Sequence, residues 1–256
     1  MTGLDALVCD LDGVLYRGSH AVPGAGTALR TLAAAGVDLH FVTNNATKTP
    51  AEAAAKIAAV TGFEAEPNMV VTSALAAVHL LGDGTPPTLL FGAAGAREAL
   101  LARGVPLVDD WHDAEVVITG LDPDLSYESL TRTVLAVRNG ARFIATNTDA
   151  TYPTPEGLAP GAGALVAAVV AGSGVEPEVA GKPEPAMRRL LAERVNGSRV
   201  AVVGDRPETD LALGHAEGWE TILVLTGVTG RGDPVVPPPT HVVDSIADVP
   251  ALYGLS

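Results

Sequence analysis

The sequence predicts an α/β fold, a Rossmann-like doubly wound parallel sheet with an inserted α/β cap domain. Short apolar runs, typical of strands buried on both faces, alternate along the chain with longer stretches of helical composition. The first run, Ala6–Cys9, is followed at once by Asp10-Leu11-Asp12-Gly13, and open α/β sheets bind ligands beyond the carboxyl ends of their strands. Stretches rich in Gly and Pro at 82–87 and 172–177 interrupt the alternation and read as linkers that bound an insertion.

The segment before the first linker contains three expected helices. Pro23 and Gly36 suit the start and the end of the first one, because Pro is favoured at the first helical position and Gly just past the last. Ser73 is a candidate N-cap for the third, since its hydroxyl can accept a backbone N–H. After the first strand, the expected elements are a helix at 23–36, a strand at 37–42, a helix at 50–60, a strand at 69–72 and a helix at 73–81.

The segment between the linkers repeats the alternation of strands and helices. Its expected elements are a strand at 88–91, a helix at 93–103, a strand at 115–119, a helix at 126–139, a strand at 142–145 and a helix at 162–171. The stretch from Asn147 to Gly163 is long, polar and rich in Pro and Gly. This composition predicts a loop of the kind that usually carries function.

After the second linker the first pattern resumes. The expected elements are a helix that follows Gly181-Lys182-Pro183 and runs to about 195, a strand at 199–203, a helix at 208–218, a strand at 221–225 and a strand at 241–243. We therefore expect a core formed by residues 1–82 and 181–256, with residues 83–180 inserted as a second α/β domain.

Charge and cysteine content narrow the class of protein. With 16 Lys and Arg against 30 Asp and Glu, the formal net charge is −14, which argues against nucleic-acid binding because that needs a basic surface. Cys9 is the only cysteine, so no disulfide can form within the chain. The first strand begins within a few residues of Met1 and no apolar stretch could span a bilayer, so neither a signal peptide nor membrane contact is expected. These observations predict a cytoplasmic protein.

Four places in the core carry polar residues suited to one chemistry. Asp10 and Asp12 would point to one face at the end of the first strand, where their charges repel unless a cation or a shared proton intervenes. Each of the four alone has an ordinary explanation, as a helix cap, a solvated lysine or a turn. Their joint occurrence favours a single site. The other three places are Thr43-Asn44-Asn45, Lys182 at a helix start, and Gly204-Asp205 with Asp210.

This order closely resembles the motifs of the haloacid dehalogenase-like phosphohydrolases. Those motifs stand here as Asp10-x-Asp12-Gly13, Thr43-Asn44-Asn45, Gly181-Lys182-Pro183 and Gly204-Asp205-x4-Asp210. The insertion lies between the second and third motifs, as in the type II capped branch. Val42-Thr43-Asn44-Asn45, Pro160-Gly161-x-Gly163-x-Leu165-Val166 and Gly181-Lys182-Pro183-x-Pro185 look like the NagD-like subfamily. That subfamily includes phosphoglycolate, glycerol-phosphate, pyridoxal-phosphate and nitrophenyl-phosphate phosphatases.

The resemblance implies a Mg²⁺-dependent phosphatase that works through an aspartyl-phosphate. Asp10 would be the nucleophile and Asp12 the general acid and base. Asp10, the backbone carbonyl of Asp12 and Asp205 would hold Mg²⁺, with Asp210 orienting Lys182 or a metal-bound water. Lys182 would offset charge on the phosphoryl group. The phosphate oxygens would bind Thr43, Asn44 and Asn45.

Substrate choice is expected to lie in the cap. The candidates are Asn147, Asp149, Tyr152, Pro153 and the helix start at Gly161–Gly163, unless this loop only joins elements of the cap. Glycerol 3-phosphate and 2-phosphoglycolate lead as substrates, and sugar, nucleotide and pyridoxal phosphates stay open. Two other functions also stay open: a phosphotransferase or phosphomutase, and a small-molecule-binding regulatory protein without activity. A homodimer through the cap is implied by the family resemblance alone.

Overall fold

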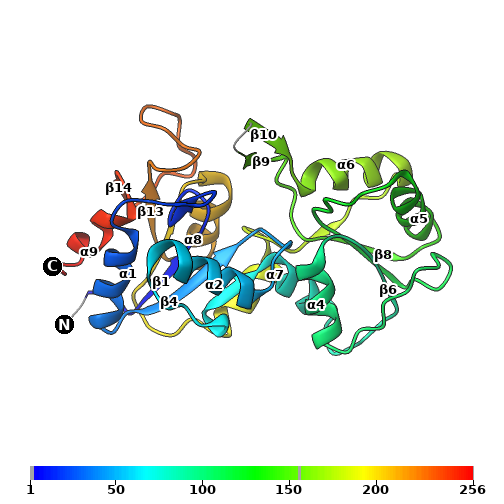
Figure 1. The fold of residues 1–256 in the computed structure, drawn as a ribbon, viewed down its shortest axis with the longest axis horizontal. Coiled ribbons are helices and arrows are strands. Elements are labelled where there is room, and N and C mark those ends of the chain that lie inside the picture. The colour runs from blue at the N-terminus through cyan, green and yellow to red at the C-terminus, as the bar shows by residue number, and fades with distance from the viewer. Residues whose placement is uncertain (1–2, 155–156, 256) are drawn as a thin grey trace. The chain divides into compact units, whose positions relative to one another are not determined.

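The structure is a computed structural model that describes residues 3–154 and 157–255. The chain forms two compact units (Figure 1). The first contains the described residues of 1–43, 51–71 and 188–256, and the second those of 44–50 and 72–187. These limits follow packing and differ from 83 and 180, which stay a prediction for the ends of the cap.

A six-stranded sheet organises the first unit. Its strand order is β14-β13-β12-β1-β4-β5, and β1 pairs in parallel with both β4 and β12. Numbered within the sheet alone, this is the Rossmann order 6-5-4-1-2-3, so the predicted fold class is confirmed. The strands are β1 (Ala6–Cys9), β4 (Asp38–Thr43), β5 (Val70–Thr72), β12 (Val200–Gly204), β13 (Glu220–Val224) and β14 (His241–Val243).

Helices cover both faces of this sheet. Successive strand residues point to opposite faces, so the apolar side chains of each strand need packing partners on both sides. One face carries Leu7, Cys9, Phe41 and Val203, all buried in one core with side chains of α1, α2 and α9. On the other face α8 packs closely, since a Cβ at Gly214 would lie 2.5 Å from Val202 Cγ1. The helices of this unit are α1 (Ala25–Ala34), α2 (Pro50–Thr61), α8 (Ala212–Glu217) and α9 (Val249–Leu252), and α7 (Pro185–Ala192) crosses from the second unit into the first.

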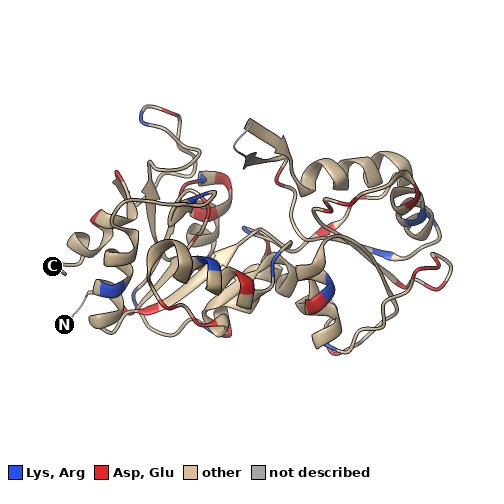
Figure 2. Cartoon of the chain, viewed as in Figure 1, with Lys and Arg blue, Asp and Glu red and all other residues tan. Residues whose placement is uncertain are grey.

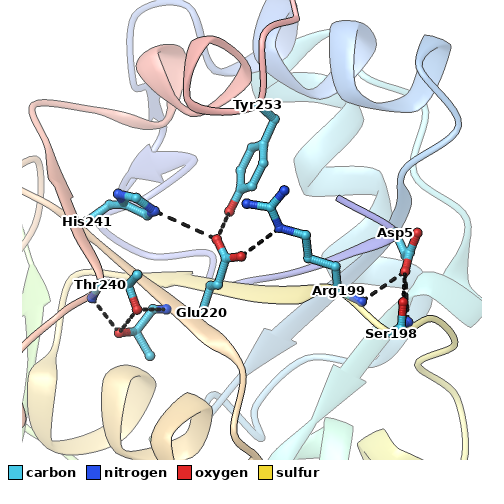
Figure 3. Close-up of polar contacts among 8 residues, drawn as sticks. Asp5, Ser198, Arg199, Glu220, Thr240, His241 and Tyr253 are labelled. Atoms are coloured by element: carbon cyan, nitrogen blue, oxygen red, sulfur yellow. Dashed lines mark hydrogen bonds and ion pairs between the residues drawn. The ribbon is translucent and has the colours of Figure 1, made fainter. Parts of the chain in front are cut away.

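A polar network fastens the amino edge of the sheet to the last helix (Figure 3). Glu220, the first residue of β13, accepts hydrogen bonds from Arg199 Nε at 2.7 Å and from Tyr253 Oη at 3.0 Å. Beside it, one carboxylate oxygen of Asp5 accepts the backbone N–H groups of Ser198 and Arg199 at 2.8 and 2.9 Å. The network ties the entries of β1, β12 and β13 together, at the sheet edge opposite to the predicted site.

A four-stranded sheet of order β11-β8-β7-β6 forms the second unit, with β6–β7, β7–β8 and β8–β11 all parallel. Its core contains Leu89, Phe91, Val117, Phe143 and Val169. The strands are β6 (Thr88–Phe91), β7 (Val116–Thr119), β8 (Arg142–Ala145) and β11 (Glu178–Val179), and the helices are α3 (Ser73–His79), α4 (Ala94–Ala102), α5 (Tyr127–Arg138) and α6 (Ala162–Ser173).

Four features differ from the sequence-based expectation. The predicted loop 147–163 contains an antiparallel hairpin, β9 (Thr151–Thr154) with β10 (Gly157–Pro160), just before α6 (Figure 1). Thr72 rather than Ser73 caps α3, because the Thr72 hydroxyl accepts the Leu75 N–H at 3.3 Å. The helix expected at 208–218 begins with a π-helical turn, Pro207–Leu211, before α8. A short hairpin of β2 (Tyr16–Arg17) and β3 (His20–Ala21) also follows β1.

Within the described part of the chain, no helix combines the length and the apolar character that crossing a membrane requires.

Candidate active site

Three carboxylates gather at the carboxyl edge of the six-stranded sheet. Asp10 follows β1, Asp205 follows β12 and Asp210 lies in the π-helical turn, and one oxygen of each lies within 4.8 Å of the others. The strands β1 and β12 are neighbours where the strand order reverses, which is where doubly wound sheets bind their ligands. Asp205 and Asp210 are 2% and 1% exposed. Buried carboxylates this close repel strongly unless a cation compensates them.

Backbone groups fix two of these carboxylates. Asp205 Oδ2 accepts the N–H of Val228 at 2.6 Å, and Asp210 Oδ2 accepts the N–H of Arg206 at 3.1 Å. The Asp10 N–H donates to the carbonyl of Val203 on β12 at 3.0 Å, which sets the register of the two strands just before their acidic ends. The carboxylates are therefore held by the sheet and by the loops that leave it.

These residues fit a divalent cation. Mg²⁺ and Ca²⁺ are hard cations that prefer carboxylate and carbonyl oxygens, and Asp10, Asp205 and Asp210 supply such oxygens from three positions. The sequence predicts that Asp210 orients Lys182 or a metal-bound water. In the structure one oxygen of its carboxylate lies within 4.8 Å of those of Asp10 and Asp205, and its role toward the ion stays a prediction.

Asp12 has a different environment from Asp10. Its Oδ1 lies 3.8 Å from Lys56 Nζ of α2, and the same ammonium lies 3.7 Å from the centre of the Tyr16 ring. The phenol of Tyr16 is buried, and its pKa is raised above the usual range first by this burial and then by the negative charges of Asp12 and Asp10. Sequence reasoning missed Lys56 and Tyr16, since nothing in the local pattern links α2 to the first motif.

Asn44 is the centre of a second polar cluster, within the second unit. Its Oδ1 accepts the backbone N–H of Lys182 at 2.7 Å, and its Nδ2 donates to the Lys182 carbonyl at 3.3 Å. The same Nδ2 lies 3.3 and 3.4 Å from the two carboxylate oxygens of Asp149. The Asn44 carbonyl accepts Asn147 Nδ2 at 2.7 Å and the Ser73 hydroxyl at 2.5 Å. The structure thus brings together four predicted site residues from three separate parts of the sequence, namely Asn44, Asn147 with Asp149, and Lys182.

The other predicted site residues differ in burial and in hydrogen-bond partners. Thr43 ends β4 and is 5% exposed, and Lys182 is also 5% exposed. The Asn45 side chain accepts both the N–H and the hydroxyl of Thr47, at 2.8 and 2.7 Å, and so stabilises a turn. Tyr152 lies on β9 and is 41% exposed. The side chain of Pro153 lies outside the described part.

The helix start Gly161–Gly163 has a structural explanation. A Cβ at Gly161 would lie 2.3 Å from the Asp149 carbonyl oxygen, and one at Gly163 would lie 2.3 Å from the Thr148 carbonyl oxygen. The Gly163 N–H donates to the Asp149 carbonyl at 2.9 Å. The two glycines let α6 begin directly against the loop that carries Asp149.

A Rossmann-ordered sheet with three clustered carboxylates where its strand order reverses defines an enzyme core with a divalent-cation site. Comparison with known proteins then gives the family. Residues 7–106 match the family model described as haloacid dehalogenase-like hydrolase, and residues 179–249 match a second model of that superfamily. The chain belongs to the haloacid dehalogenase-like hydrolases and, within them, to the NagD-like branch.

Three relatives illustrate the similarity. An acid sugar phosphatase from Staphylococcus saprophyticus is 37% identical over 97% of this chain and 98% of its own length. A hypothetical protein from Pyrococcus horikoshii has a crystal structure with a TM-score of 0.92, at 35% identity over 97% of this chain and 99% of that one. A glycerol phosphate phosphatase from Mycobacterium tuberculosis, in complex with magnesium, has a TM-score of 0.85 at 35% identity, over 95% of this chain and 75% of that one.

Proposed function

We propose that this chain is a Mg²⁺-dependent phosphatase that hydrolyses a small phosphomonoester through an aspartyl-phosphate at Asp10. The observation that carries the proposal is the group formed by Asp10, Asp205 and Asp210 at the carboxyl edge of the sheet. A phosphatase needs a cation there because three carboxylates alone would repel an anionic substrate. The phosphatase names of two of the relatives support the same reaction.

The reaction would proceed in two displacements at phosphorus. An oxygen of Asp10 attacks phosphorus while the bond to the alcohol oxygen breaks, and Asp12 gives that oxygen a proton. A water then attacks the phosphorus of the aspartyl-phosphate, Asp12 takes up its proton, and the carboxylate of Asp10 is regenerated with free phosphate. Asp10, Asp205 and the backbone carbonyl of Asp12 would hold Mg²⁺, which would neutralise negative charge at the reacting phosphoryl group. Asp210 would complete its surroundings.

Lys182 and the residues that follow β4 would bind the phosphoryl group. Lys182 would offset negative charge on the phosphoryl oxygens, as lysines do in phosphoryl transfer. Thr43, Asn44 and Asn45 would donate hydrogen bonds to these oxygens. Because Asn44 holds the backbone of Lys182 on both sides, its first contribution would be to position that lysine.

A polyol or hydroxy-acid phosphate fits as substrate. Asn147, Asp149 and Tyr152 would face the part of the substrate that is not phosphate, and the carboxylate of Asp149 suits hydroxyl groups. Glycerol 3-phosphate and 2-phosphoglycolate therefore lead, and a sugar phosphate is supported by the name of the Staphylococcus relative. Acidic positions lie on elements of both units (Figure 2), consistent with a small-molecule substrate rather than nucleic acid. A cytoplasmic location, a homodimer and a cap formed by residues 83–180 belong to the same proposal.

Phosphate release from a panel of phosphomonoesters, with Mg²⁺ and with a chelator, tests this function. We expect turnover that needs the metal and is lost in Asp10→Asn, whereas Asp124→Asn, at an exposed acidic position of the second unit, should match the wild type. Transfer to an added alcohol or sugar in place of free phosphate would instead identify a phosphotransferase. A folded, Mg²⁺-binding protein without turnover would identify a regulatory binder. If Asp149→Ala hydrolyses the panel of phosphomonoesters in the same order of preference as the wild type, Asp149 does not determine substrate specificity.

A further inference from the structure

The loop after β13, residues 226–229, contacts the predicted metal site although it contributes no acidic side chain. The Val228 N–H donates to Asp205 Oδ2 at 2.6 Å, and the Thr229 N–H donates to the Asp205 carbonyl at 3.3 Å. The loop therefore holds both the carboxylate and the backbone of Asp205. A charge-assisted hydrogen bond from a backbone N–H to a carboxylate is strong and directional.

Two glycines pack against the same carboxylate. A Cβ at Gly227 would lie 1.8 Å from Asp205 Oδ2, and a Cβ at Gly13 would lie 2.5 Å from the same oxygen. Gly13 also has a φ of +89°, which side chains rarely adopt. Asp205 is thus enclosed by backbone from two loops, and only glycine fits at either position.

Thr226 joins the loop to the turn that carries Asp10 and Asp12. Its hydroxyl donates to the carbonyl of Gly13 at 2.6 Å. Its own carbonyl accepts Arg17 Nε, from the second residue of β2. One short segment therefore fixes the turn after β1 and the carboxylate after β12, the two parts that a single cation would join.

We infer that residues 226–229 are a positioning element for the metal site, and that Thr226 and Gly227 set its affinity for Mg²⁺. The inference rests on the proposed function only in that the ion is the phosphatase cofactor. Groups that orient metal ligands from behind often change affinity as much as a ligand does, by about 10- to 100-fold. Displacing Asp205 by a methyl group at Gly227 would act in this way.

Calorimetric titration of the substrate-free protein with Mg²⁺ tests the inference without using activity. We expect Gly227→Ala to raise the Kd for Mg²⁺ by about 10- to 100-fold and Thr226→Val, which loses one hydrogen bond, to raise it by about 3- to 10-fold. Gly230→Ala is the matched control, because its Cβ would meet only the Asp233 carboxylate, at 3.3 Å. Its Kd should equal that of the wild type.

Melting temperatures measured in chelator separate folding from metal binding. If Gly227→Ala does not fold, Thr226→Val decides alone. Wild-type Mg²⁺ affinity in the folded variants would overturn the inference, and so would a wild type that binds no Mg²⁺. A wild type that binds Mg²⁺ but releases no phosphate would contradict the proposed function while leaving this test intact.

Discussion

Replacing Asn44 by Ala should destabilise the protein markedly, because one side chain satisfies the backbone of a buried residue. The variant loses the 2.7 Å bond that Asn44 Oδ1 accepts from the Lys182 N–H, and two weaker contacts of Nδ2 at 3.3 Å. A buried N–H left without its acceptor costs about 1–3 kcal/mol. With a further ~0.5 kcal/mol for each weaker contact, the expected loss is about 3 kcal/mol. For a chain of this size that corresponds to a fall in Tm of about 6–12 °C.

Thermal unfolding followed by circular dichroism measures this loss. Asn196→Ala serves as the control, since that exposed amide makes one hydrogen bond, to the Arg194 carbonyl at 3.0 Å. It should change stability by no more than about 0.5 kcal/mol. An Asn44→Ala protein as stable as Asn196→Ala would refute the reasoning, because it would mean that the Lys182 N–H finds another acceptor at no cost.

Three further predictions concern the first unit. Partial burial alone would raise the pKa of Glu220, but the hydrogen bond from Arg199 contributes to a net lowering. Glu220 therefore stabilises the fold above its ordinary pKa of about 4.3 and less as pH falls below it, so Glu220→Gln should be less stable than the wild type at pH 7 and no less stable at pH 3. Equal unfolding free energies at pH 7 would contradict this. Lys56→Met should lower the unfolding free energy by about 1 kcal/mol, because the contacts with the Tyr16 ring and with Asp12 are lost. Lys56→Arg, which keeps the positive charge, should lose much less, and thermal melts of both variants measure the difference. Adding Mg²⁺ to 100 times its Kd should stabilise the protein by about 2.7 kcal/mol over the value in chelator, and an unchanged Tm would argue against a metal site.

The sheet and its acidic ends could be predicted because their signals are local. The run Ala6–Cys9 is apolar and is followed directly by Asp10, and the structure has the same strand with the same bounds. Strand Arg142–Ala145 was likewise predicted with its observed bounds. Parallel strands buried on both faces need unbroken apolar runs, so the sequence marks them clearly.

The hairpin in 147–163 was predicted wrongly as a loop. Its strands contain Pro153, Gly157 and Pro160, residue types that are depleted in strands. The pairing of β9 with β10 is a property of the folded unit, which local composition does not record. The cap of α3 was misplaced by one residue for a similar reason, because Thr72 and Ser73 are both capable caps and the backbone geometry selects Thr72.

The contacts around the site depend on distant segments. Asn44 and Lys182 are 138 residues apart in the chain, and Val228 lies 23 residues after Asp205. Asn44 and Lys182 could be predicted as site residues because both belong to motifs of a known family. The loop at Val228 could not, because it contacts Asp205 through a backbone N–H, which any residue except proline provides. A Gly close to the end of an expected strand, as Gly227 is to the strand expected at 221–225, is the one signal that would have pointed there.

Trapping the covalent intermediate tests the central claim most directly. A single turnover quenched in acid, followed by proteolysis and mass spectrometry, should show phosphate on the peptide that contains Asp10 in the wild type and none in Asp10→Asn. Phosphate release by the wild type with no phosphorylated peptide under these conditions, or with phosphate on another residue, would contradict the assignment of Asp10 as nucleophile.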